Sequence, residues 1–66
     1  MKKVHIENEL VALQSNMRNF AFSLTLNREE AEDLLQDTTL RVLDNQEKYT
    51  ENINFKGWVL TIMKNI

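Results

Sequence analysis

Apolar residues recur along the first 25 positions at alternating steps of four and three. Steps of this size place side chains on one face of an α-helix. The pattern therefore predicts an amphipathic helix from about residue 5 to about residue 25, with polar residues on its other faces. Its apolar face consists of Ile6, Leu10, Leu13, Met17, Phe20 and Leu24.

A second helix is predicted to begin after Asn27. The side-chain oxygen of Asn27 can accept from free N–H groups of the next turn, and Glu30 completes a capping-box pattern. Acidic residues crowd the first turns, where the helix dipole favours negative charge. The apolar face, which fades near Asn45, consists of Ala31, Leu34, Leu35, Thr38, Val42 and Leu43.

Residues 45–54 are polar and carry no helical pattern, so we expect a loop anchored by Tyr49 and Ile53. Asn54 is positioned to cap a third helix. The pattern of that helix is still running when the sequence ends, which indicates a fragment of a longer domain. Its apolar positions are Phe55, Trp58, Val59, Ile62 and Ile66.

Three amphipathic helices of these lengths can enclose one small core. The predicted fold is therefore all-α, a three-helix bundle formed as one domain by residues 1–66. The spacing of Trp58 from Phe55 and Ile62 predicts a core position rather than an exposed stacking position. Met17 and Met63 are expected to fill gaps in the same core.

Composition narrows the class of protein. The 66 residues include no cysteine, so neither a disulfide nor a thiolate metal site is expected, as suits a cytoplasmic protein. No stretch is apolar enough to span a membrane. The net charge of −2 divides into −3 for residues 1–45 and +1 for residues 46–66. The first part suits a basic protein partner, and the second part is not repelled by phosphate.

Enzymatic chemistry finds little support. The chain has one histidine, His5, which is expected at the surface, and it has no glycine-rich loop. A metal or acid–base site would need carboxylates that converge in a pocket. The acidic residues at the start of the second helix are explained more simply as a solvated face that compensates the helix dipole. Neither catalysis nor a cofactor is therefore expected. The carboxylates are Glu29, Glu30, Glu32, Asp33 and Asp37.

The ordered motifs point to a specific family. LTLNREEAEDLLQDTTLRVL, residues 24–43, is followed by FKGWVLTIMKN, residues 55–65. Together they resemble region two of bacterial sigma factors of the extracytoplasmic-function (ECF) class, which pairs A-E-D-L-x-Q-[D/E]-x-x-[L/I]-[R/K] with F-x-x-W-x-x-x-I-x-x-N. The resemblance covers about residues 8–66. It implies a transcription initiation factor domain that binds core RNA polymerase and recognises the melted minus-ten promoter element.

In that family the first motif helix binds the coiled-coil clamp helices of the largest polymerase subunit. An acidic, amide-bearing helix face can pair with arginines of a partner helix, and a leucine can anchor it. The resemblance also allows an anti-sigma factor as a partner. The implied polymerase contacts are Asp33, Gln36, Asp37, Leu40 and Arg41.

The second motif helix resembles the part that reads the minus-ten element as single-stranded DNA. A flipped base is read by an amide, which Asn65 offers, and Tyr49 can stack on a base. The polar loop corresponds to the variable specificity loop of the family. The implied DNA contacts are Lys48, Tyr49, Asn52, Lys56, Lys64 and Asn65.

The chain departs from the family in several places. Thr39 stands where phenylalanine is usual, Leu26 stands where glycine is common, and Gly57 lowers helix propensity in the third helix. The remainder of the promoter-reading helix and region four are missing from the sequence. Two alternatives remain: a helical protein-interaction module that ignores polymerase, and an enzyme subunit that uses the carboxylates.

Overall fold

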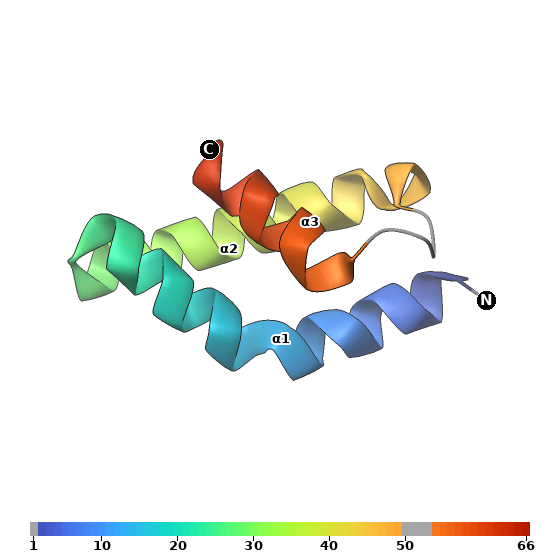
Figure 1. Ribbon diagram of the computed structural model, residues 1–66, viewed down its shortest axis with the longest axis horizontal. Coiled ribbons are helices and arrows are strands. Elements are labelled where there is room, and N and C mark those ends of the chain that lie inside the picture. The colour runs from blue at the N-terminus through green and yellow to red at the C-terminus, as the bar shows by residue number, and fades with distance from the viewer. Residues whose placement is uncertain (1, 50–53) are drawn as a thin grey trace.

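A computed structural model describes residues 2–49 and 54–66, with side chains from residue 6 onward. Its helices are α1 (Lys2–Thr25), α2 (Arg28–Asp44) and α3 (Phe55–Lys64), and a single 3₁₀ turn, η1 (Gln46–Lys48), follows α2. Each α-helix packs against the other two. Figure 1 shows α1 and α2 as a hairpin, with α3 lying across it. The predicted all-α, three-helix bundle is confirmed.

Both predicted caps form. Asn27 Oδ1 accepts from the Glu30 N–H at 3.0 Å, and Asn54 Oδ1 accepts from the Gly57 N–H at 3.3 Å. The reciprocal half of the capping box differs from the prediction, because the Asn27 N–H donates to Thr25 Oγ1 at 3.4 Å. A hydroxyl two residues earlier therefore takes the place expected for the Glu30 carboxylate.

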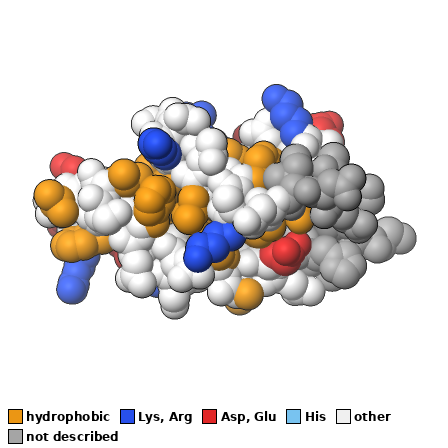
Figure 2. Space-filling model, viewed as in Figure 1, with side chains coloured by type: hydrophobic (Ala, Val, Ile, Leu, Met, Phe, Trp, Pro, Cys, Tyr) orange, Lys and Arg blue, Asp and Glu red, His pale blue; other side chains and the backbone are white. Residues whose placement is uncertain are grey.

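The corner between α1 and α2 depends on Leu26, which has a φ of 56°. Its N–H donates to the Phe22 carbonyl at 2.7 Å and closes the end of α1. A left-handed residue with a side chain is strained, which explains why glycine is common here in the family. The Leu26 side chain is 77% exposed, and Figure 2 shows apolar side chains at this end of the molecule.

The core lies along the inner faces of all three helices. Thr38 is buried among apolar residues, and its Oγ1 donates to the Leu34 carbonyl at 2.7 Å, which satisfies the hydroxyl. Met17 and Met63 lie in the core as predicted. The buried apolar residues are Ile6, Leu10, Leu13, Met17, Ala21, Ala31, Leu35, Val42, Phe55, Val59 and Met63.

Two predicted core positions are wrong. Leu24 is 45% exposed, because the buried face of α1 steps from Met17 to Ala21 and leaves Phe20 at its margin. Ala21 has no bulk beyond Cβ, so it lets α1 and α2 approach closely near their corner. Ile66 is likewise 45% exposed, because it lies beyond the end of α3.

Candidate protein and nucleic-acid interfaces

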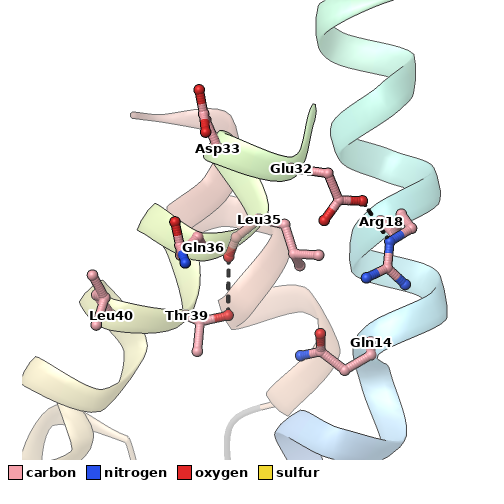
Figure 3. A pocket seen from close by; sticks show the side chains of 8 residues that line it. All are labelled: Gln14, Arg18, Glu32, Asp33, Leu35, Gln36, Thr39 and Leu40. Carbon is pink, nitrogen blue, oxygen red and sulfur yellow. Dashed lines mark hydrogen bonds and ion pairs between the residues drawn. The ribbon is translucent and has the colours of Figure 1, made fainter. Parts of the chain in front are cut away.

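A groove runs between α1 and α2, and we call it the α1/α2 groove (Figure 3). Leu35 is buried at its floor, and the half-buried Thr39 turns its Oγ1 back to the Leu35 carbonyl at 2.9 Å. Its side chains include two carboxylates and one guanidinium, so the groove is acidic. The lining residues are Gln14, Arg18, Glu32, Asp33, Leu35, Gln36, Thr39 and Leu40.

Three of the five predicted polymerase contacts meet in this groove. Asp33, Gln36 and Leu40 lie on its α2 side, and all three are exposed. Leu40 is 58% exposed, so its side chain is accessible to a partner. The α2 side therefore offers a carboxylate, an amide and an apolar contact in one row.

Asp37 and Arg41 do not line the α1/α2 groove. They form an i,i+4 ion pair on the surface of α2, with Arg41 Nε 3.8 Å from Asp37 Oδ1. Arg41 instead borders a second groove, between α2 and α3. The five predicted contacts are thus divided between two faces of one helix.

Sequence reasoning missed the α1 side of the first groove. Arg18 Nε donates to Glu32 Oε2 at 2.8 Å, so one ion pair bridges α1 and α2. Gln14 lies one helical turn before Arg18, and its Nε2 donates to the Leu10 carbonyl at 3.2 Å. The i,i+4 spacing of Gln14 and Arg18 was visible in the sequence, but nothing there showed which element the polar face of this helix would meet.

The second groove, which we call the α2/α3 groove, has different chemistry. Arg41 and Lys48 supply positive charge, Asn45 and Asn65 supply amides, and Trp58 supplies an aromatic face. Among residues 2–49 and 54–66 no carboxylate lines it, although Asp37 lies within reach of Arg41. Cations, amides and an aromatic ring are the groups that bind single-stranded nucleic acid. The lining residues are Arg41, Asn45, Lys48, Trp58, Thr61, Ile62 and Asn65.

The predicted DNA contacts are spread over more than one place. Lys48 and Asn65 meet in the α2/α3 groove. Tyr49 and Lys56 line a separate hollow beside Glu9 of α1. The remaining lysine, Lys64, is exposed at the end of α3 and lines neither of these hollows.

Three residues with predicted roles or positions lie wholly or partly outside the described part of the chain. Asn52 and the expected anchor Ile53 lie outside the described residues, and the side chain of His5 does as well. The roles assigned to Asn52 and to the other DNA contacts stay predictions.

Trp58 belongs to both the core and the α2/α3 groove. It is half-buried, and its ring lies 5.2 Å from that of Tyr49 and 6.0 Å from that of Phe55. Tyr49 also meets Phe55 edge to face at 5.2 Å. The predicted packing role of Trp58 and the predicted anchoring role of Tyr49 therefore agree with this aromatic cluster. One side of Trp58 still faces the groove.

The carboxylates of α2 are spread along the surface of the helix. Within residues 2–49 and 54–66, no group of three or more His, Cys, Asp or Glu side chains is placed to hold a metal ion. Glu29, Glu30, Glu32, Asp33 and Asp37 are all exposed along the helix surface. In the same described part of the chain, no helix has the length and hydropathy needed to cross a membrane.

The structure thus places an acidic groove and a groove lined by cations along one shared helix, α2. A sequence model of the family described as Sigma-70 region 2 matches residues 10–66. The chain is also 34% identical, over 61 residues, to the ECF RNA polymerase sigma factor EcfG of Rhodopseudomonas palustris (strain TIE-1). No solved structure matches. The chain belongs to the sigma-70 region 2 family, and the predicted resemblance to region two of ECF sigma factors is confirmed.

The match to EcfG covers 92% of this chain and 34% of that protein. The chain therefore spans about a third of the length of this relative. The segment that matches the family model, residues 10–66, contains both grooves, because it includes most of α1 and all of α2 and α3.

Proposed function

We propose that this domain binds core RNA polymerase through the α1/α2 groove and single-stranded minus-ten promoter DNA through the α2/α3 groove. In this role it is a cytoplasmic, non-enzymatic transcription initiation module. The observation that supports the proposal most directly is that α2 presents different kinds of side chain to the two grooves. Asp33 and Gln36 face one groove, whereas Arg41 faces the other. The family membership supplies the two partners, and the charges indicate which groove suits each one.

The polymerase side rests on charge and exposure. Asp33 can accept from an arginine or lysine of a partner helix, and Gln36 can both donate and accept beside it. Leu40 adds an exposed apolar anchor within a polar rim, as protein interfaces commonly have. The largest subunit's clamp helices are the partner that the family resemblance implies for this motif.

The polymerase side can be tested with the tagged chain and core RNA polymerase by biolayer interferometry. Asp33→Ala and Gln36→Ala should each weaken binding by about 1–3 kcal/mol, because each removes one polar anchor. Both should fold like the parent, since neither residue is buried. Asp44→Ala is the matched control, because Asp44 is an exposed carboxylate of α2 that lines neither groove. Unchanged affinity in both variants would refute the assignment of this groove.

The DNA side rests on the meeting of Lys48, Trp58 and Asn65. The Asn65 amide is exposed, while its backbone N–H donates to the Thr61 and Ile62 carbonyls, each at 3.2 Å. The backbone is therefore held and the side chain is available to a base edge. Arg41 and Lys48, which line the same groove, can contact phosphates of the strand.

Fluorescence anisotropy with labelled single strands can separate these roles, with core polymerase present to hold the domain. Asn65→Ala should remove the preference for a matched over a scrambled minus-ten strand, while general affinity remains. Lys48→Ala should weaken the binding of both strands alike and reduce the salt dependence of that binding. Equal binding of both strands by the parent would show that Asn65 does not read a base. The assignment of the α1/α2 groove to polymerase would be unaffected.

A further inference from the structure

The α1 side of the α1/α2 groove carries a guanidinium whose hydrogen-bonding capacity is only partly used. Arg18 donates through Nε to Glu32 Oε2 at 2.8 Å, and its side chain remains 51% exposed. Figure 3 shows the two terminal nitrogen atoms of Arg18 turned away from Glu32 and toward Gln14. A guanidinium has five N–H donors in a planar fork, so one bond to Glu32 leaves several that can reach a further acceptor.

The two sides of the groove therefore differ in sign. Asp33 and Gln36 line the groove from α2, Arg18 and Gln14 line it from α1, and Leu35 is buried at its floor. A partner helix that presented only basic residues would satisfy α2 and would meet Arg18 with like charge. A helix that carries a basic residue on one side and a carboxylate on the other would match both sides.

We propose that Arg18 is a second anchor for the polymerase, and that it binds a carboxylate on the helix whose basic residue pairs with Asp33. The fork of Arg18 suits a bidentate pair with such a carboxylate. Arg18 is thus a specificity determinant that selects a helix of mixed charge over a uniformly basic one. This inference rests on the proposed polymerase-binding function and adds the charge pattern of the partner.

The competing explanation is that Arg18 only ties α1 to α2 through Glu32. The charge-swapped pair Arg18→Glu with Glu32→Arg tests these two roles, and Glu32→Gln is measured beside it because Glu32 also lines the groove. The swap can rebuild an ion pair between the helices, and an exposed pair contributes little to stability in either order. The swap also places a carboxylate where the partner's carboxylate is expected.

The test is the affinity of the swapped and parent chains for core RNA polymerase, with thermal unfolding measured in parallel. We expect a melting temperature close to that of the parent and an affinity lower by about tenfold or more. Arg28→Ala, which removes an exposed arginine outside the α1/α2 groove, should leave the affinity unchanged. A swap that keeps parental affinity would overturn the inference.

A second measurement keeps the test independent of the swap. In a hairpin peptide of the clamp helices, each Asp or Glu is replaced by Asn or Gln in turn. One replacement should weaken binding of the parent about tenfold and leave binding of Arg18→Ala unchanged, because the pair is already broken. If no replacement couples to Arg18, the inference fails. If Asp33→Ala nevertheless lowers the affinity for core RNA polymerase, the proposed function stands without the inference about Arg18. If the parent chain does not bind polymerase, both fall together.

Discussion

The rings of Tyr49 and Trp58 lie 5.2 Å apart at an interplanar angle of 33°. Tyr49 follows η1 directly, and Trp58 lies in the first turns of α3. The contact therefore joins the end of the α2 segment to the start of α3 and fixes one wall of the α2/α3 groove. Aromatic pairs at this distance add to the stability gained from burial.

Truncation of Trp58 tests whether this cluster supports the fold. Trp58→Ala should lower the free energy of unfolding in urea by about 2–3 kcal/mol, somewhat less than for a fully buried tryptophan, because Trp58 is half-buried. Trp58→Phe should retain most of the stability, since an aromatic ring remains against Tyr49. If Trp58→Ala unfolds like the parent but no longer binds single-stranded DNA, Trp58 stacks on bases and does not stabilise the core.

The corner residue Leu26 predicts a stabilising substitution. Leu26→Gly should raise the free energy of unfolding by about 1 kcal/mol, because glycine adopts the left-handed conformation without a Cβ clash. Little packing is lost, since the side chain is 77% exposed. Leu26→Ala is the control, because it removes the same exposed side chain and keeps the clash, so it should give no comparable gain. A Leu26→Gly protein less stable than the Leu26→Ala protein would show that the corner is not strained.

Gly57 offers a second stabilising change, in the first turn of α3. A Cβ at this position would lie 3.7 Å from Asn54 Cγ, which is an ordinary contact, so alanine fits. Gly57→Ala should therefore raise the melting temperature, with a gain of about 0.5–1 kcal/mol from helix propensity. Lys56→Ala, its exposed neighbour, should change stability by less than about 0.5 kcal/mol. A loss of stability in Gly57→Ala would mean that the added methyl group disturbs the Asn54 cap.

The sequence was sufficient for features that depend on neighbouring residues. Asn27 and Asn54 cap their helices because a cap needs only a side chain and the N–H groups of the next turn. The family motif predicted Asp33 and Gln36 as polymerase contacts; they line one groove, and their role stays a prediction.

Features that depend on how helices meet were not predictable in the same way. The buried face of α1 reaches Ala21 rather than Leu24, because close approach of α2 favours a small residue over a more hydrophobic one. Arg18 and Gln14 gave no signal, since polar residues on a helix face look alike until a second helix lies beside them. The sequence also did not show that Arg41 would border the α2/α3 groove; its predicted polymerase contact stays a prediction.

In the proposed function, the two grooves of α2 hold two partners at the same time. The direct measurement is the anisotropy of a labelled minus-ten single strand titrated with core RNA polymerase, with and without this chain. We predict a rise in anisotropy that requires the chain, that is lost in Asp33→Ala, and that survives in Asp44→Ala. A rise that does not need the chain, or displacement of the strand from the chain by polymerase, would show that the two grooves do not hold both partners together.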